Sequence, residues 1–306
     1  MSRRGWLLFL AMGVIWGIPY LLIKVAVADL TPATLVLFRT ALGALILVPL
    51  AAARGELAPL RRHWRWILLY TVVEVTMPWF LLADAERHLS SSLTGLLLAA
   101  VPIAGALLAW VTRGVDRPDA RHVAGLVVGF VGVAALLGQD VSRGSVGAVA
   151  EVGLVIVGYA SGPMIISRRL SDLPVVGVVA VSLALTALVY APLGLAQLPQ
   201  ATPPIHVLAS VGVLGVVCTA LAFILFFALI AEVGPVRATV ITYINPAVAL
   251  LLGVLLLREP FTLAALTGFA LILAGSFLTT RRSTEPRPGP IATNQGEPAV
   301  ESVAIP

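Results

Sequence analysis

The stretch Pro19-Tyr20-Leu21-Leu22-Ile23-Lys24 has a counterpart 144 positions later in the same chain, Pro163-Met164-Ile165-Ile166-Ser167-Arg168. Each stretch begins with a proline inside an apolar segment and ends with a basic residue. The same 144 positions separate Pro102 from Pro246. These matches predict that the chain contains one architecture twice.

Composition places this architecture in a membrane. Of the 306 residues, 59% are hydrophobic and 11% are charged, whereas about a quarter of the residues in a soluble domain are charged. A helix needs about 20 mostly apolar residues to cross the hydrocarbon core. The sequence therefore predicts an all-α polytopic membrane protein with ten spans, near residues 5–26, 33–53, 66–83, 92–112, 121–138, 146–166, 174–195, 206–230, 236–257 and 261–279.

The repeat divides the ten predicted spans into two sets of five. Because five is odd, the second set must enter the bilayer in the opposite orientation, as in the inverted repeats of many carriers. The predicted units are two five-helix repeats, residues 1–140 and 141–280. Residues 281–306 are polar and rich in proline, which predicts a disordered cytoplasmic tail.

The arginines predict how the chain is oriented. With the N-terminus in the cytoplasm, fifteen arginines fall in the inside segments and three, Arg87, Arg143 and Arg258, fall outside. An excess of lysine and arginine in short loops marks the cytoplasmic side. Both termini are therefore predicted to be cytoplasmic. The net charge of +5 then reflects topology and not binding to nucleic acid.

Small residues and prolines indicate where helices approach or bend. The spacings Gly13-x-x-x-Gly17 and Gly125-x-x-x-Gly129 are typical of close helix pairs, within a repeat or at a homodimer contact, although glycine is also generally enriched in membrane helices. Interrupted helices at matching places in two repeats point to a binding site near the midplane. The matched prolines given above are therefore candidates for helix breaks that line a cavity.

Glu74 is the outstanding polar residue, because it lies near the centre of the third predicted span. Ionisable residues inside a membrane are costly and are candidates for function. Burial favours the neutral form of a carboxyl group, so Glu74 is a candidate to exchange a proton for substrate or to pair with a cationic substrate. The alternative is a structural carboxylate held by a neighbouring hydroxyl or arginine.

Three basic residues lie within or at the ends of spans. Arg39 is in the outer third of the second span, where it could anchor an anion, pair with Glu74 or extend to the outer headgroups. Lys24 and Arg168 lie at span ends. Extension to the headgroups accounts for both, and their equivalence in the repeat leaves a gating role open.

Aromatic and amide side chains at depth are candidates to line a pocket for flat or cationic organic molecules. The residues proposed for this role are Trp16, Tyr20, Trp79, Tyr243 and Asn245. The sequence has no P-loop, no zinc-protease motif and no nucleophile elbow. We therefore expect neither an enzyme nor a protein that needs a cofactor or metal.

Several of these stretches resemble the drug/metabolite transporter superfamily, specifically its ten-helix EamA-type permeases. The resemblance covers residues 5–280 and rests on residues 16–24, which match W-G-x-x-x-x-x-x-K, on Arg39, on the stretches 90–102 and 235–246, and on residues 257–260. One departure is that residues 112–115 lack the acidic residue expected as the equivalent of Glu259. The resemblance implies export of small metabolites, amino acids or drug-like compounds across a bacterial inner membrane, driven by proton exchange.

The leading hypothesis is a proton-coupled secondary exporter with its cavity between the two repeats. An uncoupled facilitator or uniporter of the same fold is the nearest alternative, and a non-transporting membrane scaffold is a more distant one. The sequence leaves the substrate open.

Overall fold

The computed structural model describes residues 1–113, 120–140, 145–234 and 238–280. Every regular element in these residues is a helix, which confirms the all-α expectation. Seven helical segments are long and apolar enough to cross a membrane, and three shorter apolar helices accompany them. This set is compatible with the ten predicted spans. The predicted disordered tail, residues 281–306, lies outside the described residues.

The first half of the chain, to residue 140, contains eight α-helices joined by shorter 3₁₀ and π segments. They are α1 (Arg3–Ile15), α2 (Pro19–Ala26), α3 (Pro32–Ala53), η1 (Ala58–His63), α4 (Trp64–Tyr70), η2 (Thr71–Thr76), α5 (Met77–His88), α6 (Ser91–Leu97), η3 (Leu98–Ala100), α7 (Val101–Arg113) and α8 (Ala120–Asp140).

The described residues of the second half, from residue 145, are also helical. Its elements are α9 (Val146–Arg169), α10 (Val175–Ala196), α11 (Ile205–Gly215), η5 (Val216–Leu221), α12 (Ala222–Val233), η6 (Thr239–Tyr243), α14 (Asn245–Leu256) and α15 (Leu263–Thr280).

Prolines interrupt three of the four helices in which they were expected to do so. The first helical span breaks after Ile15, and Pro19 opens α2. Pro102 and Pro246 each occupy the second position of an α-helix that follows a 3₁₀ segment. By contrast, α9 is continuous through Pro163. A proline removes only one backbone hydrogen bond, and neighbouring membrane helices can support the helix around it.

Two π-helical segments, η2 and η5, occur at equivalent places in the third and eighth predicted spans. They start at Thr71 and Val216, and end at Thr76 and Leu221, an offset of 145 positions at both ends. π-Helical turns are rare and are frequent at functional sites. This match adds to the proline correspondence of the two halves.

A close helix approach joins the two halves through glycines of α8 and α15. A Cβ atom on Gly125 would lie 2.8 Å from the carbonyl oxygen of Gly275, and one on Gly132 would lie 2.8 Å from that of Gly268. As one residue number rises the other falls, so the helices are antiparallel. The two contacts are exchanged by the 143-position offset of the repeat, as a two-fold relation between the halves would require. The inverted repeat stays a prediction with which these contacts are compatible.

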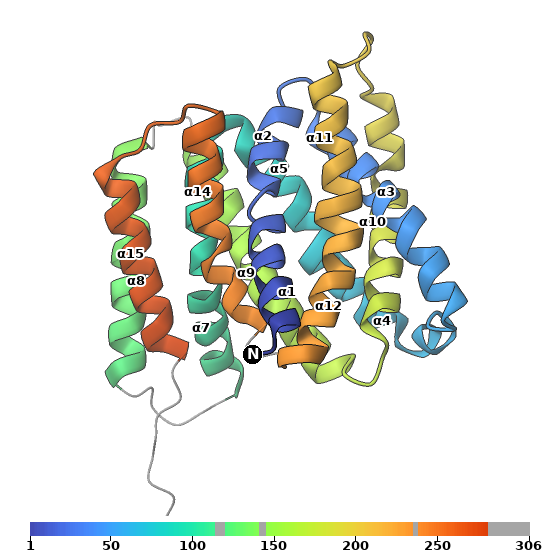
Figure 1. Cartoon of the computed structure of the whole chain (residues 1–306), viewed down its shortest axis with the longest axis horizontal. Coiled ribbons are helices and arrows are strands. Elements are labelled where there is room, and N and C mark those ends of the chain that lie inside the picture. The colour runs from blue at the N-terminus through green and yellow to red at the C-terminus, as the bar shows by residue number, and fades with distance from the viewer. Residues whose placement is uncertain (114–119, 141–144, 235–237, 281–306) are drawn as a thin grey trace, which may run out of the picture.

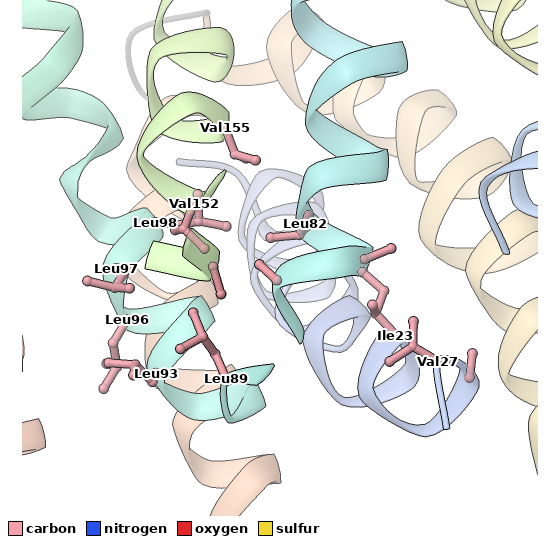
Figure 2. Packing of buried hydrophobic residues seen from close by; sticks show 14 of the residues in the cluster. Ile23, Val27, Leu82, Leu89, Leu93, Leu96, Leu97, Leu98, Val152 and Val155 are labelled. Atoms are coloured by element: carbon pink, nitrogen blue, oxygen red, sulfur yellow. The ribbon is translucent and has the colours of Figure 1, made fainter. Parts of the chain in front are cut away.

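The α8–α15 pair lies at the left end of the molecule in Figure 1, and a second pair, α3 with α10, lies at the right end. The hydroxyl of Thr34 in α3 donates to the carbonyl oxygen of Gly194 in α10 at 2.9 Å. Between these ends, a core of buried apolar side chains joins α2, α5, α6 and α9; Figure 2 shows part of it, including Ile23, Leu82 and Val152.

Replacing Gly132 with alanine should destabilise the protein by about 1–3 kcal/mol, because the added methyl group overpacks the α8–α15 contact. The methyl group would meet the backbone of α15 at 2.8 Å, and a backbone cannot move aside as a flexible side chain can. The matched control is Gly212→Ala in α11, where no atom lies within 4 Å of the added carbon. Thermal unfolding in detergent should show a lower midpoint only for Gly132→Ala, and equal midpoints would contradict this packing.

Candidate functional site

The guanidinium group of Arg39 occupies the interior between the two halves. Arg39 is only 7% exposed. Its Nε donates to the hydroxyl oxygen of Thr219 at 3.1 Å, and its Cζ lies 3.7 Å from the centroid of the Trp79 ring. A cation over an aromatic face is stabilised most when both are shielded from water. Arg39 therefore joins α3, α5 and η5, and it does not extend to the headgroups.

The π segment η5 prepares Thr219 for this contact. The Thr219 hydroxyl donates to the carbonyl oxygen of Leu214, five residues earlier, at 2.8 Å. Since its hydrogen is used in that bond, the oxygen presents lone pairs to Arg39. The locally wider helix of η5 thus positions the Thr219 hydroxyl that binds the buried Arg39 guanidinium group.

Two tyrosines and a glutamate lie within electrostatic range of this cation. Tyr20 and Tyr159 are close enough to Arg39 to interact with it electrostatically, and so is Glu86. Tyr159 also packs against the buried cluster that contains Trp79. No ion pair joins Arg39 to Glu86 in the described part of the chain.

Glu74 lies in η2 with its carboxyl group against Gly162 of α9. A Cβ atom on Gly162 would come within 2.6 Å of the Glu74 Cδ, so only glycine leaves room for this carboxyl group. The Oε2 atom of Glu74 is buried and has no hydrogen-bond partner among the residues that the structure describes. Among the residues described, no ion pair links Glu74 to Arg39. The pairing considered from the sequence is therefore not formed.

Hydroxyl groups fix η2 to α10 of the other half. Thr71 donates to the Ser182 hydroxyl at 2.8 Å, and the hydroxyls of Thr76 and Thr186 are 2.8 Å apart. The Tyr190 hydroxyl donates to the carbonyl oxygen of Thr76 at 3.0 Å. Irregular backbone at membrane depth requires such partners. The π segment that carries Glu74 is therefore held in place by hydrogen bonds to α10.

Lys24, in α2, binds the C-terminal end of α5. Its Nζ donates to the carbonyl oxygens of Glu86 at 2.5 Å and Leu89 at 2.8 Å, at the C-terminus of α5. The partial negative charge of a helix C-terminus favours a cation there. Lys24 is thus bound inside the protein. The carboxyl group of Glu86 is 0% exposed and has no hydrogen-bond partner for either oxygen within the described residues.

Glu259, from the second half of the chain, binds the N-terminus of α6 in the first half. Its two carboxyl oxygens accept hydrogen bonds from the backbone N–H groups of Ser91 and Ser92 at 2.8 and 2.9 Å. An acidic group at a helix N-terminus satisfies otherwise unpaired donors and complements the helix dipole. The α5–α6 connection is therefore held by Lys24 on one side and Glu259 on the other.

The other predicted residues lie in separate contacts. The Trp16 ring packs 4.7 Å from the ring of Phe226. The Asn245 amide, oriented with its nitrogen as donor, bonds to the carbonyl oxygens of Ile241 and Gly13. Tyr243 lies half-buried in η6, and Arg168 donates to the Thr112 hydroxyl. Of the predicted set, the structure gathers Arg39, Trp79 and Tyr20, while Glu74 occupies its own position against α9.

Sequence reasoning missed Glu86, Thr219 and Gly162. Glu86 falls after the predicted span 66–83, in a stretch that also contains Asp84, Arg87 and His88. The available signal was its helical spacing from Trp79, Leu82 and Ala83, all of which are buried on the same face. No group of three histidine, cysteine, aspartate or glutamate side chains that could hold a metal occurs in the searched part of the structure.

Several helices are long and apolar enough to cross a membrane, and buried charges lie between the two halves of the chain. These features are typical of a multi-pass transporter. The comparisons with known proteins agree. The sequence pattern of the EamA-like transporter family matches residues 3–138 and again residues 151–281. The protein belongs to this family, which confirms the resemblance found in its motifs.

The chain is similar to an uncharacterized transporter, YvbV, of Bacillus subtilis, with 24% identity over 96% of this chain and 97% of the relative. It is also similar to the "probable terminal-alkyne amino-acid exporter" of Streptantibioticus cattleyicolor, with 28% identity over 92% of this chain and 95% of that protein. A solved crystal structure with 22% identity shares the fold with a TM-score of 0.64, over 92% of this chain and 97% of the other. The family and these relatives indicate a transporter of small molecules and not an enzyme.

Proposed function

We propose that this protein is a proton-coupled secondary transporter that exports a small metabolite, amino acid or drug-like compound across the inner membrane. The observation that carries the coupled mechanism is the buried carboxyl group of Glu74, which lies within a candidate membrane span. One of its oxygens has no hydrogen-bond partner in the described part of the chain. Such a group is stable there when neutral and is destabilised when charged. Proton uptake and release at Glu74 would therefore be tied to opening of the site to water.

Alternating access is proposed to arise from the two halves as inverted repeats, residues 1–140 and 141–280. The matched π segments and the exchanged glycine contacts of α8 and α15 support this relation. The first helix begins and α15 ends on the same, lower side in Figure 1. The arginine distribution favours the cytoplasm for that side. A homodimer stays a prediction.

The buried charges around Arg39 favour a small zwitterion as substrate. Arg39 suits a carboxylate, because its planar donors match carboxylate geometry. Glu86, close to Arg39 but not paired with it, suits an ammonium group. Trp79, in contact with Arg39, and the nearby Tyr20 and Tyr159 would supply apolar and aromatic surface for the rest of the substrate. An amino acid presents both charges on a short frame, and one relative is named as an amino-acid exporter.

The test begins with thermal-shift screening of purified protein against amino acids, nucleobases, cationic dyes and sugars. A stabilising compound is then followed as flux in proteoliposomes with and without an imposed pH gradient. The proposal expects binding by an amino acid and flux that responds to the gradient. Flux without such a response would identify an uncoupled facilitator or uniporter. Absence of binding and flux across the whole panel would favour a non-transporting scaffold.

A further inference from the structure

A pocket of about 300 Å³ lies apart from the central site, at the end of α9 between α4 and α7. Apolar side chains, among them Leu108 and Ile165, form one part of its wall. The other part is polar and basic, with Thr112, Arg168 and Arg169, and the Trp66 ring lies beside them. The pocket is thus apolar towards the membrane interior and positive at the ends of the helices.

The pocket faces away from the core of the protein. Tyr159 of α9 packs into the buried cluster around Trp79. Arg168 follows Tyr159 by nine residues, which is about two and a half helical turns, so it lies on the opposite face of α9. Leu154 and Val157, 52% and 49% exposed, lie on that outer side. The pocket is therefore a groove on the outer surface of the helix bundle, on the face of α9 opposite Tyr159 and the Arg39 contacts.

Both arginines are held over the groove by neutral partners. The Nη2 of Arg168 donates to the Thr112 hydroxyl at 3.0 Å, and the Arg169 guanidinium lies 4.6 Å from the centroid of the Trp66 ring. Neither forms an ion pair with an acidic side chain among the described residues. Two positive charges consequently share one groove, and no acidic side chain in the described ranges is paired with either of them.

We propose that this groove binds an anionic phospholipid. The lipid phosphate lies between Arg168, Arg169 and Thr112, and one acyl chain follows Leu108 and Ile165. Arginine matches phosphate oxygens with planar, paired donors. Basic pockets between membrane helices bind anionic lipid headgroups, and each basic residue near the membrane surface strengthens the attraction to anionic lipid. The combination of a basic rim with an apolar wall favours a lipid over a free anion, because a free anion has no apolar part to contact that wall.

The experiment measures lipid retained by the purified full-length protein in native mass spectrometry. Phosphatidylglycerol is compared with phosphatidylcholine of the same acyl chains. We expect phosphatidylglycerol to be retained in preference, and its apparent affinity to fall at least about tenfold in the double variant R168Q/R169Q. The matched control is R61Q/R62Q, which removes the same charge from η1 outside the groove and should keep wild-type retention.

Two further arms separate the alternatives. Ile165→Trp fills the groove without changing charge, and it should also reduce phosphatidylglycerol retention. Inorganic phosphate, added without lipid, should not stabilise the protein against heat. Equal retention of both lipids, equal loss in both double variants, or heat stabilisation by inorganic phosphate that depends on Arg168 and Arg169 would each overturn the proposal.

Discussion

Glu74→Gln protein should fold and bind substrate but lose the transport that an imposed pH gradient drives. Glutamine has nearly the same shape, so it fits against Gly162 as the carboxyl group does. It cannot take up or release a proton, and a fixed neutral group removes the link between proton and substrate movement. Gradient-driven flux in proteoliposomes should fall to the rate of protein-free liposomes, while substrate exchange without a gradient continues.

The control for this variant is Glu232→Gln, which removes an exposed carboxylate at the end of α12. It should leave gradient-driven flux unchanged. Thermal unfolding of both variants should match that of the wild type, which separates loss of coupling from loss of folding. Gradient-driven flux that persists in Glu74→Gln would remove Glu74 from the mechanism and would leave the facilitator as the better description.

The positions of most spans could be predicted because the bilayer imposes them. The span expected at residues 33–53 is the helix Pro32–Ala53, and the one expected at 174–195 is Val175–Ala196. In hydrocarbon, a chain must satisfy its backbone within a helix, so apolar length alone fixes such elements. The third span was predicted too short, as 66–83, whereas the helical segment covers Ala58–His88.

That error has a specific physical cause. After Ala83 the charged residues suggest a loop, but the helix continues with Asp84 and Arg87 paired on the outside at 3.0 Å. Glu86 turns to the inside on the same helix. A hydropathy average cannot distinguish charged residues that face water from one that faces the core, because only the packed neighbours decide which is which.

The contacts that form the candidate site could not be predicted for a related reason. Arg39 and Thr219 are 180 positions apart, and Glu74 meets Gly162 only because α9 packs against η2. The sequence marked Arg39 and Glu74 as unusual through their depth in apolar segments. The sequence did not indicate which residues contact them, because those contacts depend on helix pairing and on the two π segments. The role expected of Glu74 thus follows from sequence and structure together, whereas the role expected of Glu86 follows from the structure alone.

Replacing Glu86 with methionine should make the protein more stable and inactive in transport. The carboxyl group is 0% exposed and neither oxygen has a hydrogen-bond partner in the part of the chain described. A buried polar group without a partner costs about 1–3 kcal/mol, and replacing such groups with apolar residues of similar volume often stabilises a protein. Lys24 would keep its position, since it binds the backbone carbonyl of residue 86 and not the side chain.

Thermal unfolding and substrate counterflow, measured on the same preparation, check this prediction. Glu86→Gln is the matched comparison: it keeps a buried polar group, so we expect no gain in stability, yet it removes the charge proposed to bind an ammonium group and should also lose transport. Asp84→Asn changes a partly exposed carboxylate two residues away and should alter neither property, since ion pairs that reach solvent contribute little. A lower unfolding midpoint for Glu86→Met would mean that the carboxyl group holds the fold together, and undiminished counterflow would exclude it from the substrate site. If both results hold, the Glu86 carboxyl group lowers stability and yet is needed for transport. A binding site retains such a group because the substrate supplies the missing partner when it binds.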